Sequence, residues 1–405
     1  MDRALLERYR AVRDATETLA APLSPEDQQL QSMPSASPTK WHRAHTTWFF
    51  ETFLLTPRGV PPLDPAYGYL FNSYYEAVGP RHARPKRGML SRPSAAEVGE
   101  YRRRVDERMF ALLEDGNPDV GALVELGLAH EEQHQELLLT DILHALSENP
   151  LLPAYRGASH MWERGDHSGF TYVTFDGGLV EIGASAGFSF DNEGPRHRVW
   201  LRPYALASRP VTVAEVRAFI EAGGYDTPSL WLAEGWDWAR ANAIRAPLYW
   251  LEEERVFGLD GVRTPDPWEP ACHLSFYEAD AIARFLGARL PTEAEWENAA
   301  SNVPVAGNTR DTGALHPRRA TSAGLGQLFG DVWEWTASPY VAYPGYAPVH
   351  GAIGEYNGKF MVNQVVLRGG SCLSPPGHLR ASYRNFWHPD TRFQMTGLRL
   401  AKDVS

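Results

Sequence analysis

The sequence predicts an α+β protein with an all-helical first part, residues 1–155, and a mixed second part, residues 156–405. Apolar residues recur at helical intervals in the first part, whereas short β-type runs between Gly and Pro turns fill the chain from about residue 170. A length of 405 residues with 43% hydrophobic side chains is enough for two or three domains with ordinary cores. We therefore expect a helical domain followed by an α+β domain.

Four long helices are predicted in the first part. They span residues 2–20, 39–55, 94–113 and 120–146. In the last of them no Gly or Pro falls between Gly127 and Pro150, and apolar residues such as Leu128, Leu138 and Ile142 keep the helical period.

His130 and His134 lie one turn apart on this last helix, with Glu131 directly after the first histidine. Side chains at this spacing are about 5–6 Å apart at Cβ, close enough for two imidazoles to bind one metal ion. The run also matches H-E-x-x-H, the pattern of two zinc ligands and a general base in metallopeptidases. Leu137 and Thr140 occupy the Gly and third-His positions of the metzincin extension, so a third ligand must come from elsewhere. The alternative is a polar helix face without a metal.

The predicted helix over residues 39–55 carries His42 and His45 among Trp and Phe residues. In such surroundings a histidine is more often a hydrogen-bonded core residue than a ligand. An incomplete histidine pair on a second helix favours ligation by one of the two, because metal sites in bundles use facing helices.

A loop rich in Gly, Pro and aromatic residues lies at residues 67–88 and includes Tyr74 and Tyr75. Its basic residues are Arg81, His82, Arg84, Lys86 and Arg87. The loop is either solvated, or it offers guanidinium groups to a carboxylate, which arginine binds through two parallel hydrogen bonds.

The overall charge of −11 argues against nucleic acid or an anionic membrane as the main partner and favours small molecules. No apolar run approaches the roughly 20 residues that span a bilayer, and the charged start shows no signal peptide, so we expect a cytoplasmic protein. Cys272 and Cys372 are too few for a disulfide framework and are expected to be reduced and buried.

Six motifs of the second part resemble, in the same order, the formylglycine-generating-enzyme fold, a variant of the C-type lectin fold. They are Phe190–His197, Arg209–Thr212, Arg289–Glu297, Gly330–Thr336, Leu367–Ser371 and Gly397–Leu400. The first part resembles the DinB-like four-helix bundle through Trp41-x-x-Ala44-His45 and His130-x-x-x-His134-Gln135-Glu136. The combination covers nearly the whole chain and resembles the iron-dependent sulfoxide synthases of ergothioneine biosynthesis, which argues against a zinc peptidase.

The resemblance implies an oxidoreductase with one non-haem Fe(II) bound by His45, His130 and His134, leaving His42 as a residue behind the ligands or in the core. Three neutral imidazoles on one face of the ion leave positions for a substrate imidazole, a thiolate and O₂. The implied reaction is oxidative C–S bond formation at imidazole C2 of hercynine, the trimethylated betaine of histidine, which gives a sulfoxide.

The resemblance also implies which residues bind hercynine. Gln133 would orient the imidazole by a hydrogen bond. The quaternary ammonium cannot donate a hydrogen bond, so aromatic faces and carbonyl oxygens must hold it. The stretch that corresponds to the family's substrate-binding residues is Asn385, Phe386 and Trp387.

Two further roles follow from the loop at residues 67–88. Tyr74 or Tyr75 would deliver a proton or an electron beside the iron and suppress plain thiol oxidation. Arg84 and Arg87 match the arginines that bind the carboxylate of the sulfur donor.

The sequence does not identify the donor of sulfur or selenium. Trp387 stands where the branch using γ-glutamylcysteine has an Asp, and the flanking residues also differ from the free-cysteine branch. The related selenoneine synthases share this architecture and join a selenosugar to hercynine, so C–S and C–Se bond formation are near equals. A formylglycine-generating oxidase needs two reactive cysteines close together, and Cys372 has only Cys272 as a mate. The oligomeric state is not predicted.

Overall fold

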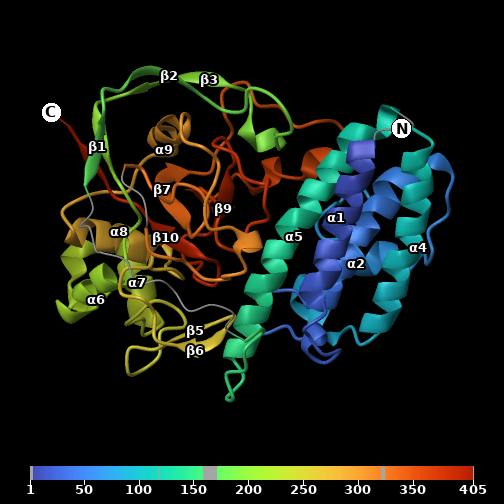
Figure 1. Ribbon diagram of the computed structural model, residues 1–405, viewed down its shortest axis with the longest axis horizontal. Coiled ribbons are helices and arrows are strands. Elements are labelled where there is room, and N and C mark those ends of the chain that lie inside the picture. The colour runs from blue at the N-terminus through green and yellow to red at the C-terminus, as the bar shows by residue number, and fades with distance from the viewer. Residues whose placement is uncertain (1–2, 117, 158–170, 321–323, 405) are drawn as a thin grey trace. The chain divides into compact units, whose positions relative to one another are not determined.

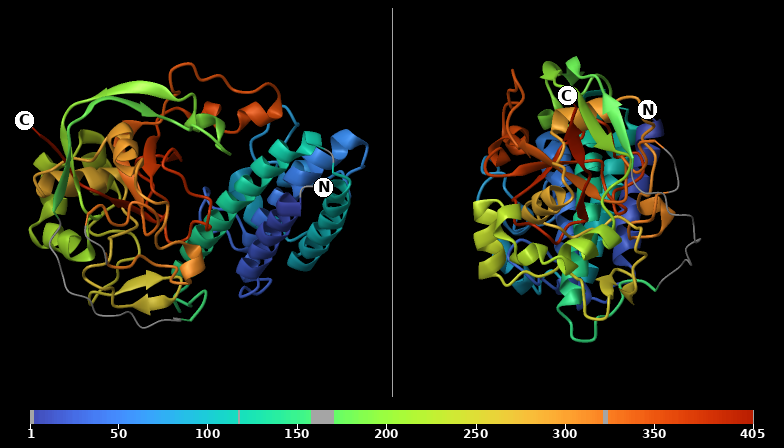
Figure 2. Two further views of the ribbon diagram at one scale, coloured as in Figure 1. Left: turned by 45° about the horizontal axis from the view of Figure 1, so that its top comes forward. Right: turned by 90° about the vertical axis from the view of Figure 1, so that its left-hand side faces the viewer.

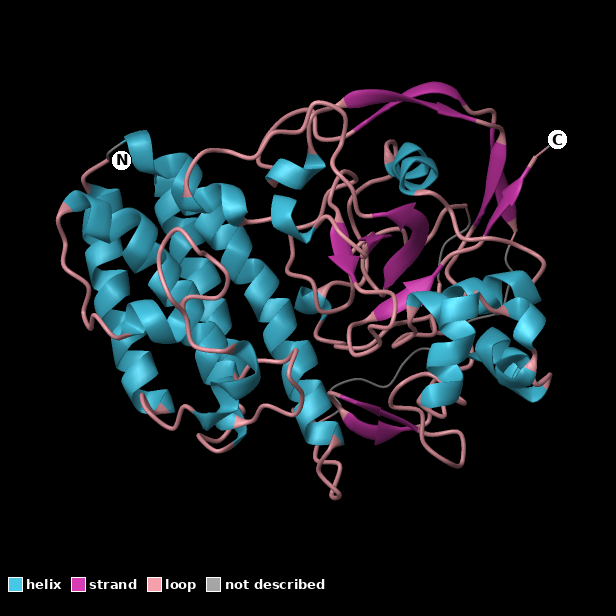
Figure 3. Cartoon of the chain, turned by 180° about the vertical axis from the view of Figure 1, so that it is seen from behind, coloured by secondary structure: helices cyan, strands magenta, loops and turns pink. Residues whose placement is uncertain are grey.

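The computed structural model describes residues 3–116, 118–157, 171–320 and 324–404. The chain forms two units: Met1–Arg156 together with Pro348–Tyr356, and Gly157–Ala347 together with Asn357–Ser405. Figure 3 shows that the first unit is helical and that the strands lie in the second. The α+β class predicted from the sequence is confirmed.

Four long helices lie side by side in the first unit (Figure 1). They are α1 (Arg3–Ala20), α2 (Thr39–Phe50), α4 (Ala95–Glu114) and α5 (Gly121–Ser147). Their contacts include α1 with α5, α2 with α4 and α2 with α5, and α2 also contacts α1, so α2 packs against all three other long helices. Ser94 begins α4 with a capping box, because its side chain accepts from the Glu97 amide while the Glu97 carboxylate accepts from the Ser94 amide.

Shorter turns connect these helices. The helix predicted over residues 39–55 continues beyond α2 as a π-helical turn, Glu51–Leu55, and a 3-10 turn, Thr56–Arg58. The loop that follows contains α3 (Tyr67–Phe71) and a 3-10 helix, Arg84–Met89.

The described residues of the second unit form four small sheets. The largest has the order β10-β7-β8-β9, with β10 parallel to β7 and the other pairs antiparallel. Its strands are β7 (Trp333–Pro339), β8 (Val365–Arg368), β9 (Asn385–Trp387) and β10 (Thr396–Leu398).

The other sheets are antiparallel. Their strands are β1 (Tyr172–Phe175), β4 (Tyr204–Ala207) and β11 (Ala401–Asp403), β2 (Gly178–Ile182) and β3 (His197–Leu201), and β5 (Val256–Gly258) and β6 (Gly261–Arg263). The helices of this unit are α6 (Val213–Glu221), α7 (Ala233–Ala241), α8 (Phe276–Phe285) and α9 (Glu293–Ala300). Helix α9 contacts β2 and β3 as well as β7 and β8, and Figure 2 shows the long β2–β3 ribbon beside it.

A buried ion pair organises the core of the second unit. Arg399 donates to the Glu334 carboxylate from Nε at 3.0 Å and from Nη2 at 2.7 Å, and both side chains are fully buried. The indole of Trp296 on α9 donates to the same carboxylate at 2.7 Å. The motifs around residues 334 and 399 therefore meet at one point of the core.

The two cysteines are free, with Cys372 buried and Cys272 only partly so, which corrects the expectation that both are buried. Among the described residues, no helix has both the length and the apolar character needed to cross a membrane.

Candidate metal centre

Three histidines from two helices converge in the first unit. His45 comes from α2, and His130 and His134 come from α5. Each offers one ring nitrogen, and the three nitrogens lie within 4.8 Å of one another. The Nε2 atoms of His45 and His130 are 3.2 Å apart. Two nitrogens that each lie about 2.1 Å from one ion at a right angle are separated by about 3 Å, so this spacing suits a shared metal ion.

All three imidazoles are held neutral. Burial lowers the pKa of His45 and His134 well below the ordinary value, and the neighbouring histidines lower it further. Burial also lowers the pKa of His130 to about 3, although Glu131 opposes this shift. A histidine must be neutral to bind a metal, so the site already has the required protonation state at neutral pH.

The ring of His45 is fixed from two sides. Its Nδ1 lies 2.6 Å from the carbonyl oxygen of Phe71, at the end of α3. A carbonyl only accepts, so Nδ1 carries the proton and Nε2 keeps its lone pair for the site. Trp41 stacks on the imidazole at 4.6 Å between centroids, with only 12° between the planes.

His42, the other candidate on α2, lies behind the cluster. Its Nδ1 is 2.8 Å from Nδ1 of His134, and its Nε2 is 3.0 Å from Oδ2 of Asp141. Both of its ring nitrogens are therefore engaged, and it is not one of the three convergent residues.

Glu131, the glutamate of the H-E-x-x-H pattern, is not available to act as a general base. Arg13 donates to one of its oxygens at 2.7 Å, and Arg102 and Thr16 donate to the other at 2.9 Å and 2.6 Å. Burial would raise its pKa, but the two guanidinium groups prevail and hold the pKa at about 2. A carboxylate fixed between α1 and α4 in this way does not serve as the base of a metallopeptidase.

The segment Pro348–Tyr356 places Tyr356, which was not predicted from the sequence, beside the cluster. The hydroxyl of Tyr356 donates to Oε1 of Gln133, and its ring lies 5.6 Å from that of His130 between centroids. The Glu355 carboxylate accepts from the backbone amides of Glu76 at 3.0 Å and Ala77 at 2.8 Å. No local signal in the sequence links this segment to the bundle, because the hydrogen-bonded residues are 223 positions apart.

The loop tyrosines lie next to one another. The rings of Tyr74 and Tyr75 are 4.6 Å apart, and Tyr74 also approaches Tyr356 at 6.3 Å. Tyr75 is fully buried against Trp48 and Phe53, and burial followed by the neighbouring tyrosines raises its pKa well above the ordinary value. The hydroxyl of Tyr75 therefore keeps its proton at neutral pH.

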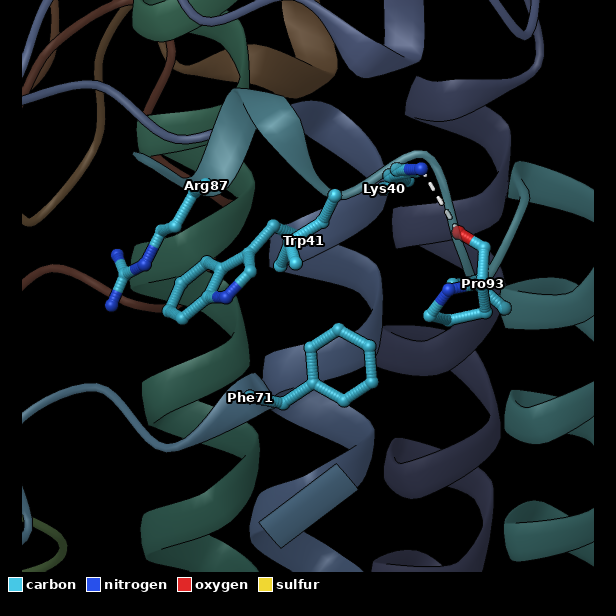
Figure 4. Close-up of a pocket in the computed structure, with 7 residues that line it drawn as sticks. Lys40, Trp41, Phe71, Arg87 and Pro93 are labelled. Atoms are coloured by element: carbon cyan, nitrogen blue, oxygen red, sulfur yellow. Dashed lines mark hydrogen bonds between the residues drawn. The ribbon is translucent and has the colours of Figure 1, made fainter. Parts of the chain in front are cut away.

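Arg87 is buried over the indole of Trp41, with Cζ 3.4 Å from the ring centroid. Figure 4 shows the two side chains together in a small pocket that Phe71 and Lys40 also line. Nη1 of Arg87 donates to the Ser37 hydroxyl at 2.9 Å. Burial and the nearby Arg84 lower the pKa of Arg87 to about 8.

Arg84 is exposed and donates to the carbonyl of Ser35. Within the part of the chain that the structure describes, neither Arg84 nor Arg87 forms an ion pair with a carboxylate. This sets them apart from Arg13 and Arg102, whose carboxylate partners lie inside the bundle.

The remaining predicted residues lie on β9 of the second unit. Phe386 stacks on Tyr340 at 3.9 Å, with 9° between the rings. Trp387 packs edge-on against Phe393, and its Nε1 is buried without a hydrogen-bond partner in the described chain. The side-chain oxygen of Asn385 accepts from the Phe386 amide at 2.8 Å.

Two family models match the chain. The DinB superfamily model matches residues 8–138, which include all three histidines. The sulfatase-modifying factor enzyme 1-like domain matches residues 159–312 and 307–404, more than half of the chain. Both matches agree with the motifs that the sequence analysis singled out.

Two relatives match this chain over nearly its whole length, and a third matches over part of it. The hercynine oxygenase of Mycolicibacterium smegmatis is 33% identical over 92% of this chain and 93% of its own. The hercynine oxygenase of Mycobacterium tuberculosis is 34% identical over 92% of both chains. The formylglycine-generating enzyme of Streptomyces coelicolor is 29% identical and covers 57% of this chain and 89% of its own. The chain therefore belongs to the hercynine oxygenase family and combines a DinB-type domain with a sulfatase-modifying-factor-type domain.

Proposed function

We propose that this protein is a non-haem Fe(II)- and O₂-dependent oxidoreductase that forms a carbon–sulfur bond at imidazole C2 of hercynine. In this reaction C2–H, the thiol and O₂ give a C2-bonded sulfoxide and water. The observation that carries the proposal is the neutral His45, His130 and His134 cluster in a chain related over 92% of its length to hercynine oxygenases.

The donor set suits iron. Three neutral imidazoles on one face of an octahedral ion leave open positions, whereas structural zinc sites are closed by four protein ligands. His45, His130 and His134 would hold the ion, which when bound supplies O₂ activation and places for both substrates. We assign the remaining tasks to the side chains around the cluster.

Gln133 and Tyr356 would orient the imidazole of hercynine. Gln133 lies between the two α5 ligands in the sequence, and the Tyr356 hydroxyl holds its side-chain oxygen. A side chain fixed in this way offers its hydrogen-bonding groups in one direction, which favours one orientation of the substrate. On the second unit we assign Asn385, Phe386 and Trp387 to substrate binding.

Tyr74 or Tyr75 would supply the proton that separates sulfoxide formation from plain thiol oxidation. Tyr75 has a raised pKa and therefore holds its hydroxyl proton until a strong base develops nearby. The ring of Tyr74 contacts that of Tyr356, which in turn contacts the ring of His130, so these side chains link the loop to the histidine cluster.

Arg84 and Arg87 would bind the carboxylate of an amino-acid thiol such as cysteine. A buried guanidinium without a carboxylate partner in the described chain is costly, and an incoming carboxylate would compensate it. The stack of Arg87 on Trp41 holds the guanidinium plane in a fixed orientation, which suits bidentate binding.

A second candidate is C–Se bond formation with a selenosugar, which makes the protein a selenoneine synthase. The observation that favours it is Trp387, because an indole face suits the CH face of a sugar ring. Its buried Nε1–H has no partner in the described residues and would donate to a sugar hydroxyl.

The test is incubation of the Fe(II)-loaded protein with hercynine and O₂, and with cysteine, γ-glutamylcysteine or a selenosugar, followed by mass spectrometry. A hercynyl sulfoxide from a thiol supports the first proposal, and a selenium adduct formed only with the selenosugar supports the second. His45→Ala is the inactive control. Turnover of none of the donors, or peptide hydrolysis with zinc, contradicts both.

A further inference from the structure

A chain of two hydrogen bonds leads from a carboxylate to the ring of His134. Asp141 Oδ2 is 3.0 Å from Nε2 of His42, and Nδ1 of His42 is 2.8 Å from Nδ1 of His134. His42 and Asp141 are 3% and 5% exposed, so water has little access to the contact between them. The backbone amide of Ser37 donates to the same Asp141 oxygen at 2.7 Å and holds the carboxylate in place.

Helical periodicity aligns the residues that form this series of hydrogen bonds. His42 and His45 are three residues apart on α2, and His134 and Asp141 are seven residues apart on α5, so each pair shares one face of its helix. The packing of α2 against α5 then brings the four side chains together.

The direction of each hydrogen bond follows from elementary chemistry. A carboxylate oxygen accepts, so the ring proton of His42 lies on Nε2, which faces Asp141. Nδ1 of His42 is then an acceptor, and Nδ1 of His134 must donate to it. Nε2 of His134 is left with a lone pair, which is the form that binds a metal ion.

Without the carboxylate, the opposite assignment becomes available. His42 could carry its proton on Nδ1 and donate to His134, whose own proton would then move to Nε2. A protonated Nε2 cannot bind a metal. For His45, one hydrogen bond to the carbonyl of Phe71 fixes the tautomer. For His134, two hydrogen bonds in series are needed.

We propose that Asp141 and His42 are positioning residues that fix the tautomer of His134 and thereby tune the metal affinity of the site. This inference rests on the metal centre proposed above. Outer partners of ligating histidines typically change metal affinity by about 10- to 100-fold when they are removed.

The variants are chosen to separate hydrogen bonding from charge. Asp141→Leu removes the acceptor, and His42→Phe removes both contacts but keeps an aromatic ring. Asp141→Asn loses the charge but keeps an acceptor, because the Ser37 amide holds the side-chain oxygen of Asn toward His42. His144→Phe is the matched control on α5, since this ring contacts the Ser32 hydroxyl.

Two measurements read out the effect without turnover. Titration with Co(II), followed by visible absorption, gives the metal affinity of the full-length protein. Nitrogen-15 NMR of histidine-labelled, metal-free protein shows which ring nitrogen of His134 carries the proton. Circular dichroism of each variant shows whether the bundle is folded.

We expect Asp141→Leu and His42→Phe to bind Co(II) about 10- to 100-fold more weakly. Asp141→Asn should lose less, and His144→Phe should match the wild type. Wild-type affinity in folded Asp141→Leu overturns the inference, and so does a proton on Nε2 of His134 in the metal-free wild type, whether or not the variants fold. If the wild type binds no Co(II), the assignment of a metal centre to these histidines is contradicted. If it binds but does not turn over hercynine, only the proposed reaction fails.

Discussion

The Nε2 atoms of His45 and His130 lie 3.2 Å apart, although the two residues are 85 positions apart in the chain. The carbonyl of Phe71 leaves a lone pair on Nε2 of His45, and the low pKa of His130 keeps that imidazole neutral. Two Nε2 lone pairs that point at each other at this distance repel unless a proton or a metal ion lies between them, and a proton on Nε2 of His130 would leave its buried Nδ1 without a hydrogen-bond partner in the described chain.

Metal binding should therefore stabilise the protein. At an Fe(II) concentration 100 times the Kd, the folded state gains about 2.7 kcal/mol, because the unfolded chain has no assembled site. The measurement is anaerobic thermal unfolding with and without Fe(II). His45→Ala should abolish the rise in Tm, whereas His42→Ala should keep part of it. Loss in His42→Ala with a full rise in His45→Ala would mean that the third ligand is assigned wrongly.

Removing the hydroxyl of Tyr356 should weaken hercynine binding. Tyr356→Phe breaks the hydrogen bond to Gln133 but leaves the ring beside His130. A neutral hydrogen bond contributes about 0.5–1.5 kcal/mol, which corresponds to roughly a 2- to 12-fold rise in the Kd of hercynine by calorimetry. Tyr69→Phe, at a partly exposed tyrosine, is the control. An unchanged Kd would remove Gln133 and Tyr356 from hercynine binding.

The loop tyrosines should control the product ratio. In Tyr74→Phe or Tyr75→Phe the ring is kept and only the proton source is lost, so packing is preserved. We expect a larger share of oxidised thiol relative to sulfoxide, measured by mass spectrometry at equal O₂ consumption. If both variants keep the wild-type ratio, neither tyrosine delivers the proton.

The loss of donor binding in an Arg87 variant should show which class of donor the protein uses. With an amino-acid thiol, Arg87→Ala should weaken donor binding by about 1.5–3 kcal/mol, the strength of a hydrogen bond to a charged group. A selenosugar has no carboxylate, so the loss with it should be smaller. Arg81→Ala is the control, since this exposed arginine pairs with Glu76. Equal losses with both donors would contradict carboxylate recognition.

Trp387→Asp tests the same question from the second unit. It replaces an indole face by a negative charge, so it should weaken use of a selenosugar more than use of cysteine. The comparison of kcat/KM for the two donors gives the answer, and a larger loss for cysteine would argue against sugar stacking.

Glu131 should matter for stability rather than for hydrolysis. Glu131→Gln leaves Arg13 and Arg102 buried with less compensation, which should destabilise the first unit by on the order of 3 kcal/mol in urea unfolding. Glu125→Gln is the control, because its ion pair with Arg8 is partly exposed. A variant as stable as the wild type would contradict this structural role.

The second unit should lose stability as the pH rises from about 4 to about 6. Burial raises the pKa of Asp331 to about 6, against hydrogen bonds from Arg318, Asn308 and Gln327. A carboxyl group with a raised native pKa binds protons more tightly when folded, so its stabilising contribution is complete below the unfolded pKa and is lost as the pH rises through 6.

The measurement is urea unfolding of Asp331→Asn and the wild type at pH 4 and pH 7.5. The stability difference should shift toward the variant by up to about 3 kcal/mol at the higher pH. Asp311→Asn, at an exposed aspartate, should show no such shift. A constant difference would mean that Asp331 does not titrate in this range.

Local periodicity and short motifs were enough to predict several features of this protein. The spacing of His130 and His134 on α5 follows from the helical repeat, and Ser94 marks the start of α4 because its side chain caps the helix. The order of the motifs predicted both domains, since turn glycines and buried ion pairs such as Arg399 with Glu334 need fixed residue types.

The surroundings of the three histidines could not be predicted from local patterns, because they depend on how the elements pack. The arrival of Tyr356 at Gln133, the enclosure of Glu131 by Arg13 and Arg102, and the path from Asp141 through His42 all join residues from different elements. Such contacts depend on how helices pack and on where a distant segment returns. Local sequence patterns carry no information on either, because the side chains meet through space across 29 to 223 positions of chain.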